Sequence, residues 1–187
     1  MRLFIAIPLP SHVSARAASV LPDTLPGLRR VKPENLHVTL AFLGETPEDR
    51  LADAAAAAEE AGRAVKPFAL RFDRAGRFPE RGRPRVVWLG IADGRESVER
   101  LGEAVYRGLR ERGLRFDDRP LAAHLTLARM QDDASLAEAR TVAAALDELP
   151  VPRLEMPVDG IALVRSVLSP KGPRYSAVVT LPLAGPS

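Results

Sequence analysis

The chain has 187 residues, of which 46% are hydrophobic and 27% are charged, a composition typical of soluble globular proteins. The absence of cysteine excludes disulfides, thiolate chemistry and cysteine-ligated metal sites. No apolar run approaches the roughly 20 residues of a membrane span, and the apolar start ends at Pro8, too early for a signal-peptide core. We therefore expect a cytoplasmic protein that does not associate with membranes.

The basic residues are almost all arginine. The net charge is only +3, but arginine supplies 24 of the 27 basic residues. Because a guanidinium group can bind two phosphate oxygens at once, some of these arginines could form a phosphate-binding surface. A compositional bias spread over the surface explains the same count, so composition leaves both interpretations open.

In chain order, the predicted elements alternate between strands and helices. We predict a strand over residues 3–8, a helix over 12–20 after Ser11, a strand over 36–43 and an alanine-rich helix over 47–61. Further along we predict strands over 68–74, 85–91, 122–128, 159–168 and 174–182, and helices over 95–112 and 133–149. The helix at 95–112 is indicated by an apolar stripe of Val98, Leu101, Val105 and Leu109, and the last helix by Asp132 or Asp133 as its cap. Strand pairs joined by tight turns favour antiparallel sheets, which indicates the α+β class.

Two of the predicted strands repeat one pattern, His37-Val38-Thr39-Leu40 and His124-Leu125-Thr126-Leu127. Because side chains alternate between the faces of a strand, each histidine shares a face with its threonine, and the aliphatic residues point into the core. Only three histidines occur in the chain, and two of them take matched positions in this repeat. A packed or surface histidine would explain one such tetrapeptide, but two copies in matching contexts indicate a functional site.

The repeated motif also indicates an internal duplication. The two copies lie nearly half the chain apart, and each is followed by a predicted helix and then a strand pair. We therefore predict a bilobal, pseudo-symmetric α+β fold with two antiparallel sheets flanked by helices around a central cleft. Residues 1–187 would form a single domain of two interlocked lobes, with the two histidines facing each other across the cleft.

Two facing histidines can work as an acid–base pair. The ordinary pKa of histidine lies close to neutral, so one neutral ring can accept a proton from a nucleophile while the other, protonated, donates one to a leaving oxygen. The threonine hydroxyls suit the non-bridging oxygens of a phosphate held between the rings. The sequence offers neither a metal-ligand pattern nor a glycine-rich phosphate loop, so we expect no metal and no cofactor.

The paired motifs, the lead-in over residues 29–37 and the continuation over 41–45 resemble the 2H phosphoesterase superfamily. The resemblance is strongest to its bacterial and archaeal RNA 2′,3′-cyclic phosphodiesterases, historically called 2′-5′ RNA ligases, and it covers nearly the whole chain. It implies a bilobal, pseudo-symmetric α+β fold with the histidines in a central cleft. It also implies hydrolysis of a terminal 2′,3′-cyclic phosphate of RNA to a 2′-phosphate.

The resemblance further implies a role for each candidate residue. His37 would be the general acid that protonates the leaving 3′ oxygen, and His124 the general base that activates water. Thr39 and Thr126 would hold the phosphate oxygens, and Arg129, which follows the second motif, would stabilise the phosphate. A pseudo-symmetric site does not fix the acid and base from sequence, so the two labels could be reversed.

Strict alternation along a strand creates a difficulty for Arg129. It places this arginine on the face of Leu125 and Leu127, so Arg129 reaches the phosphate only if the strand ends or twists there, or if its side chain reaches round. The same alternation places Phe42 on the aliphatic face of the first motif, which favours a core residue over a platform on which a base stacks. The basic stretch at 29–32 and the loop at 77–85 would either contact RNA phosphates or be solvated.

The expected partner is RNA that ends in a 2′,3′-cyclic phosphate, bound by a monomer. The reverse reaction, 2′-5′ ligation of RNA ends, could occur at the same site as a minor activity, because hydrolysis dominates in water. A phosphodiesterase for small cyclic nucleotides is an alternative, since an acid–base pair reads the phosphate rather than the base. A non-catalytic RNA-binding protein that uses the same cleft is another alternative, and an activity assay separates it from the enzymes.

Overall fold

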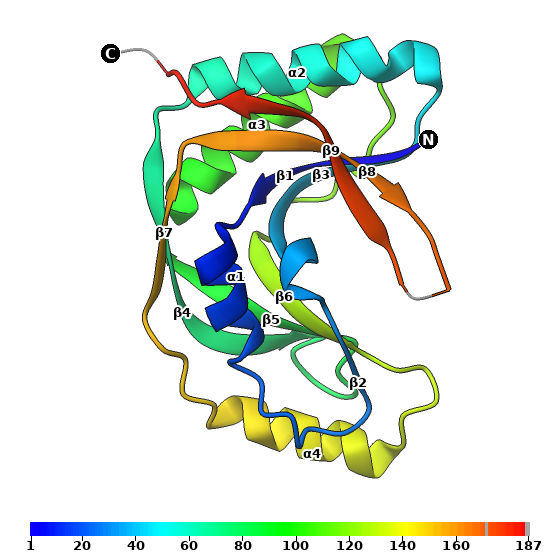
Figure 1. Ribbon diagram of the computed structural model, residues 1–187, viewed down its shortest axis with the longest axis vertical. Helices are drawn as coiled ribbons and strands as arrows, with labels where there is room; N and C mark the ends of the chain where they lie inside the picture. Colours follow the sequence, from blue (N-terminus) through cyan, green and yellow to red (C-terminus); the bar gives the residue numbers. More distant parts are fainter. Residues whose placement is uncertain (171, 186–187) are drawn as a thin grey trace.

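A computed structural model describes residues 1–170 and 172–185, which form a curled antiparallel sheet flanked by helices (Figure 1). Its strands are β1 (Arg2–Pro8), β2 (Leu28–Arg30), β3 (His37–Glu45), β4 (Phe68–Phe78), β5 (Val86–Asp93), β6 (His124–Met130), β7 (Leu154–Val158), β8 (Gly160–Val167) and β9 (Arg174–Pro182). Its α-helices are α1 (Ser11–Ala18), α2 (Leu51–Ala64), α3 (Arg95–Glu111) and α4 (Leu136–Asp147), and short 3₁₀ helices cover Pro33–Asn35 and Glu48–Arg50. The predicted α+β class is confirmed. None of the helices in the described residues has the length and apolar character needed to cross a membrane.

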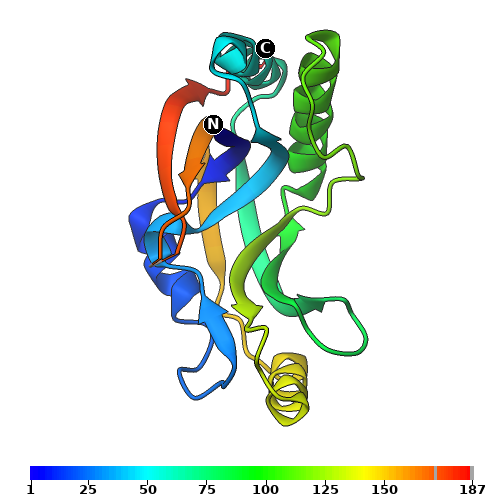
Figure 2. The ribbon, with the colours of Figure 1, turned by 90° about the vertical axis from the view of Figure 1, so that its right-hand side faces the viewer.

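The strands form one sheet in the order β7-β4-β5-β6-β3-β1-β8-β9, with β2 paired to β6. The two motif strands, β3 and β6, meet at its centre and pair through Val38 and Leu125. The two sheets expected from the duplication are therefore joined into one, because antiparallel backbone pairing continues across the boundary between the lobes. The side view shows how strongly this sheet curls (Figure 2).

The sheet repeats one arrangement on either side of the β3–β6 boundary. Outward from β3 lie β1 and then β8, and outward from β6 lie β5 and then β4. Strands β8 and β9 come late in the sequence, yet they complete the half that holds β1 and β3. Each half of the sheet therefore combines strands from separate parts of the sequence.

The helices bury apolar faces against the sheet and against each other. Helix α2 contacts α3, β8 and β9, whereas α3 contacts β3 and α4 contacts β4. The apolar stripe predicted for the helix at 95–112 is confirmed, since all four of its residues have 0% exposure: Val98, Leu101, Val105 and Leu109. Helices α2 and α3 lie together at one end of the molecule and α4 lies at the other (Figures 1 and 2).

The start of α4 differs from the prediction. The Ser135 side chain accepts a hydrogen bond from the Glu138 backbone N–H, and the Glu138 carboxylate accepts one from the Ser135 backbone N–H. This capping box satisfies two N–H groups that the first turn leaves unpaired. Ser135 therefore caps the helix, and neither Asp132 nor Asp133 does.

Candidate active site

The two motif strands present histidine and threonine on one face of the sheet, as predicted. His37, Thr39, His124 and Thr126 are partly exposed. The aliphatic residues of the motifs are almost completely buried, with exposures of 0% for Val38, Leu40 and Leu125 and 3% for Leu127. Alternation along each strand thus holds from the histidine to the second aliphatic residue.

Alternation breaks in β6 directly after this point. Thr126 and Ala128 pair with two adjacent residues of β5, so Leu127 is an extra residue and forms a β-bulge. Leu127 and Ala128 are both buried, and Arg129 beyond them is exposed on the histidine face. The bulge therefore turns the Arg129 side chain onto the face of the histidines, which strict alternation would not do.

The first motif strand contains the same irregularity. Thr39 and Ala41 pair with adjacent residues of β1, which makes Leu40 the extra residue. Phe42 consequently turns away from the core and is 50% exposed. The prediction that Phe42 belongs to the core is wrong, because the bulge at Leu40 shifts the alternation of side chains by one residue.

All five predicted site residues line one cleft of about 520 Å³. His37, Thr39, His124, Thr126 and Arg129 come from the two central strands, and the remaining wall includes Asn35, Phe42, Phe78, Tyr106, Asp117, Arg119 and Tyr175. Among the residues that the structure describes, no three His, Cys, Asp or Glu side chains are grouped as a metal site would require. The duplication therefore brings two distant motifs into a single cavity.

Both histidine rings are held by the same local hydrogen bond. Nδ1 of His37 lies 2.7 Å from the backbone oxygen of Asn35, and Nδ1 of His124 makes the equivalent bond to Ala122. A carbonyl oxygen can only accept, so Nδ1 carries the hydrogen in both rings. Nε2 of each neutral ring is therefore left without a proton, and it is the nitrogen available to a substrate.

Aromatic side chains pack against both histidines. The distances between ring centroids are 4.8 Å for Phe4 and 5.4 Å for Tyr175 around His37, and 5.1 Å for Phe78 and 6.3 Å for Trp88 around His124. These contacts fix the planes of the two imidazoles and remove much of their surface from water. The two acid–base candidates are thus held in similar environments.

These environments change the pKa of both histidines. Burial, which disfavours the charged ring, lowers the pKa of His37 and of His124, and the hydrogen bond to the backbone carbonyl opposes this effect. The positive charge of Arg129 lowers both values further, and the charge of His124 does the same for His37. Both rings therefore favour the neutral form, whereas an anion bound between them would favour protonation.

Three of the six arginines in the two predicted basic stretches have structural partners. They donate to backbone carbonyls as follows: Arg30 to Leu21 and Pro22, Arg77 to Ala143, and Arg83 to Gln131 and Asp132. At the edge of the cleft, Arg119 pairs with Asp117. Arg129 has no carboxylate partner within the described residues, so its guanidinium is available to a ligand.

Sequence reasoning missed two residues of the site. Asn35 holds the His37 ring through its backbone oxygen, and its side-chain amide donates to the Pro173 carbonyl across 3.0 Å. Tyr175 lines the cleft from the distant strand β9, and burial raises the pKa of its phenol. An asparagine two residues before the first motif histidine was a usable signal for Asn35, whereas nothing near Tyr175 in the sequence marks it.

Comparison with known proteins identifies the class. Residues 9–169 match the family model described as the 2′-5′ RNA ligase superfamily. The chain therefore belongs to this superfamily, and the resemblance to the 2H phosphoesterases is confirmed.

Several curated relatives share one name. The chain is 39% identical to an RNA 2′,3′-cyclic phosphodiesterase of Thermus thermophilus, over 99% of this chain and 91% of that protein. It is 35% identical to a protein of the same name from Archaeoglobus fulgidus, over 94% of this chain and 96% of the relative. Each match spans nearly the full length of this chain and of the relative.

Solved structures show the same fold. The crystal structure of TT0787 of Thermus thermophilus has a TM-score of 0.79 and 36% identity, over 99% of each chain. Escherichia coli LigT complexed with 3′-AMP has a TM-score of 0.75 and 26% identity, over 97% of each chain. The curled sheet described above is therefore shared by proteins of known structure.

Proposed function

We propose that this protein hydrolyses the terminal 2′,3′-cyclic phosphate of RNA to a 2′-phosphate with a two-histidine acid–base mechanism. The observation that carries the proposal is the shared geometry of His37 and His124, whose Nδ1 atoms are both bound to the backbone and whose Nε2 atoms are both available in one cleft. The names of the curated relatives support the same substrate class.

In the proposed reaction, Nε2 of neutral His124 removes a proton from a water molecule. The water oxygen attacks phosphorus in line with the 3′ oxygen, the bond from phosphorus to the 3′ oxygen breaks, and protonated His37 donates its Nε2 proton to that oxygen. The product carries a phosphate on the 2′ oxygen. The negative charge of the bound phosphate raises the pKa of the His37 ring, which offsets the effect of burial.

Three further side chains bind the phosphate in this scheme. Thr39 and Thr126 donate hydroxyl hydrogens to non-bridging oxygens, and Arg129 places its guanidinium against the negative charge that accumulates in the transition state. Each of them shares the cleft with the two histidines. Phe42 adds an exposed aromatic surface on which a base of the RNA can stack.

The same site is compatible with two related activities and with one alternative function. Ligation of RNA ends through a 2′-5′ bond is the reverse reaction and would be minor in water. Small cyclic nucleotides would be substrates as well if the cleft recognises only the phosphate and makes no contact with a base. A protein that binds RNA in the cleft without catalysis is the alternative from another class.

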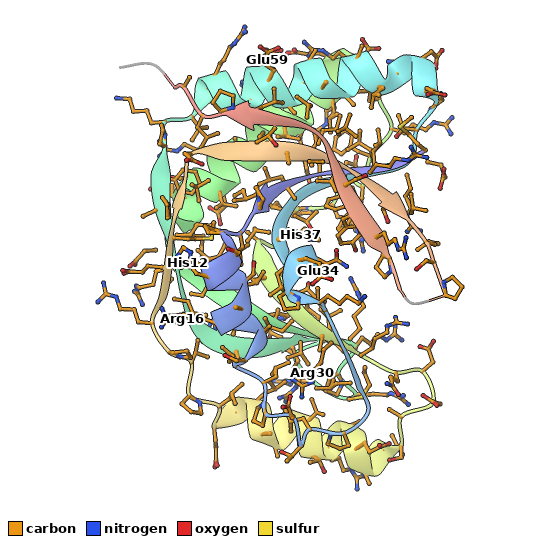
Figure 3. The ribbon with its side chains drawn as sticks, in the orientation of Figure 1. His12, Arg16, Arg30, Glu34, His37 and Glu59 are labelled. Atoms are coloured by element: carbon orange, nitrogen blue, oxygen red, sulfur yellow. The ribbon has the colours of Figure 1, made fainter. Side chains whose placement is uncertain are left out.

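The test is hydrolysis of an RNA oligomer that ends in a 2′,3′-cyclic phosphate, measured in EDTA. We expect a 2′-phosphate product, and we expect His37→Ala and His124→Ala each to lose at least about 10²-fold in rate. His12→Ala is the matched control, because the third histidine is exposed on α1, away from the cleft (Figure 3). A wild-type protein that binds this RNA but does not cleave it would establish the non-catalytic alternative.

A further inference from the structure

Strand β2 brings a second arginine to the face of the sheet that carries the active site. Arg29 of β2 and Arg129 of β6 lie directly opposite each other, and residues in this relation project from the same face of an antiparallel pair. Val31 follows two residues after Arg29, donates its backbone N–H to Leu127 of β6 and lines the cleft. Alternation along the chain therefore also places Arg29 on the cleft side, where it is exposed.

Neither Arg29 nor Arg129 forms an ion pair within the described residues 1–170 and 172–185. Like charges directly opposite each other on neighbouring strands are unfavourable, so the fold itself gains nothing from this arrangement. Arg30 shows the contrast, because it donates to the carbonyls of Leu21 and Pro22 and thereby holds the segment before the first motif. The two facing arginines therefore indicate a ligand that carries negative charge.

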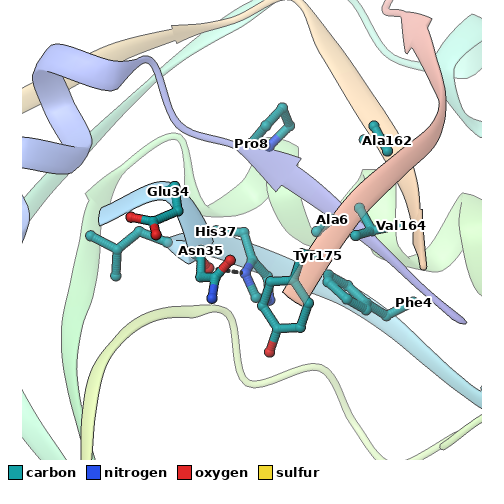
Figure 4. Close-up of a pocket in the computed structure, with 11 residues that line it drawn as sticks. Phe4, Ala6, Pro8, Glu34, Asn35, His37, Ala162, Val164 and Tyr175 are labelled. Carbon is teal, nitrogen blue, oxygen red and sulfur yellow. Dashed lines mark hydrogen bonds between the residues drawn. The ribbon is translucent and has the colours of Figure 1, made fainter. Parts of the chain in front are cut away.

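The opposite side of the cleft, around His37, has a different character (Figure 4). The pocket that adjoins the cleft there is lined mainly by apolar side chains such as Phe4. Apart from the ring of His37 itself, Glu34 is the only ionisable acid or base with a full charge at neutral pH among the described residues that line this pocket. A carboxylate repels a phosphate. A second phosphate near the active site is therefore attracted to the end of the cleft where β2 and β6 meet.

We propose that Arg29 binds the phosphodiester group on the 5′ side of the terminal nucleotide, while Arg129 binds the cyclic phosphate. The inference rests on the proposed function, in which the ribose with the cyclic phosphate lies in the cleft. In RNA, the 5′ oxygen of that same ribose carries the next phosphate along the chain, so a single sugar separates the two anions. Opposite side chains of two strands have Cβ atoms about 4.5–5.5 Å apart, and two long guanidinium side chains can reach two phosphates spaced in this way.

This assignment identifies the substrate as the end of an RNA chain. A small nucleoside 2′,3′-cyclic phosphate has only one phosphate and leaves Arg29 without a ligand. The contact therefore favours RNA over small cyclic nucleotides, which the acid–base pair alone does not distinguish.

The test compares adenosine 2′,3′-cyclic phosphate with and without a phosphate on its 5′ oxygen, so that both substrates have the same base and the same reacting group. We expect Arg29→Ala to lower the kcat/KM ratio of the 5′-phosphorylated over the unphosphorylated substrate by about fivefold or more, because one charge-assisted contact is lost. Arg29→Lys, which keeps the charge, should retain most of the ratio. Arg100→Ala is the matched control and should keep the wild-type ratio, since this exposed arginine lies on α3 and does not line the cleft.

A ratio in Arg29→Ala equal to that of the wild type, or an equal fall in Arg100→Ala, would overturn the assignment while the proposed function stands. Calorimetry identifies the reverse case. If the wild type hydrolyses neither substrate, but Arg29→Ala weakens the binding of adenosine 2′,5′-bisphosphate more than that of 2′-AMP, the phosphate site stands and the proposed catalysis fails. Equal weakening of both ligands in such an inactive protein would reject both proposals.

The salt dependence of RNA hydrolysis gives a second measurement. Each phosphate contact with a single-stranded nucleic acid contributes about 0.7 to the slope of log K against log salt concentration. For an RNA oligomer that ends in a 2′,3′-cyclic phosphate, the slope of log kcat/KM should therefore become shallower by about 0.7 in Arg29→Ala and keep its wild-type value in Arg100→Ala. An unchanged slope in Arg29→Ala would exclude a contact between this arginine and a phosphate.

Discussion

Phe42 and Arg129 occupy equivalent positions in the two halves of the protein. Each lies five residues after its motif histidine, and each is turned toward the cleft by a β-bulge two residues earlier. One half thus adds an apolar ring to the cleft, and the other adds a positive charge. The two sides of a nearly symmetric site therefore differ. In the proposed mechanism the phosphate binds on the Arg129 side and a base stacks on the Phe42 side.

Replacement of Arg129 is expected to weaken transition-state binding. Arg129→Ala should lower kcat on a cyclic-phosphate RNA by roughly 10²-fold, since one charged donor to the phosphate is lost. Arg119→Ala is the control, because Arg119 also lines the cleft but is paired with Asp117. Equal losses of kcat for the two variants would show that both arginines act only through the overall positive electrostatic potential of the cleft.

Replacement of Phe42 should affect binding rather than stability. Stacking of one base on an aromatic side chain contributes about 1–3 kcal/mol, so Phe42→Ala should raise KM for an RNA oligomer between about fivefold and 10²-fold. The melting temperature should change little, because half of the ring is already exposed. Phe42→Tyr, which keeps the ring, should have a KM close to that of the wild type. A large fall in Tm with unchanged KM for Phe42→Ala would show that Phe42 acts as a core residue.

The local sequence pattern is sufficient to predict which site residues share a face of a strand, wherever side chains alternate strictly. His37 and Thr39 share a face because successive side chains of a strand do, and no other part of the chain is needed for that conclusion. Phe42 lies beyond a bulge, and a bulge is defined by the register with a neighbouring strand. Alternation therefore fails for Phe42 and Arg129 for the same reason. The family resemblance implied a role for Arg129, and the structure brings this residue into the cleft.

Long-range pairing explains the other differences. Strand β7 was not predicted, because its five residues include Pro157, which argues against a strand. β7 lies at the edge of the sheet, where a missing N–H is tolerated, and Leu154, Met156 and Val158 still alternate inward. Tyr175 reaches the cleft only because β9 returns to the first half of the sheet, which no short stretch of sequence reveals.

The two threonines can be tested without a change in side-chain shape. Thr39→Val and Thr126→Val remove one hydroxyl each and keep a β-branched side chain that suits a strand. We expect kcat to fall by about 10²-fold in each variant, with little change in Tm, because a donor to the phosphate is lost. Thr39→Ser should keep most of the activity, and Thr141→Val on the exposed face of α4 should have no effect on kcat. Full activity in both valine variants would exclude the hydroxyls from phosphate binding.

The two motif histidines should also make stability depend on pH. Burial lowers the pKa of His37 and His124 below the ordinary value of 6.5, so the unfolded chain binds protons at these sites more readily than the folded protein. The free energy of unfolding should therefore be highest above pH 6.5 and should fall as the pH drops through 6.5 toward the lowered pKa values. In the double variant His37→Gln/His124→Gln, which cannot take up these protons, Tm measured from pH 8 to about 5 should fall less steeply than in the wild type. His12→Gln, at an exposed site, should follow the wild-type curve; a double variant that also follows it would show that neither motif histidine resists protonation.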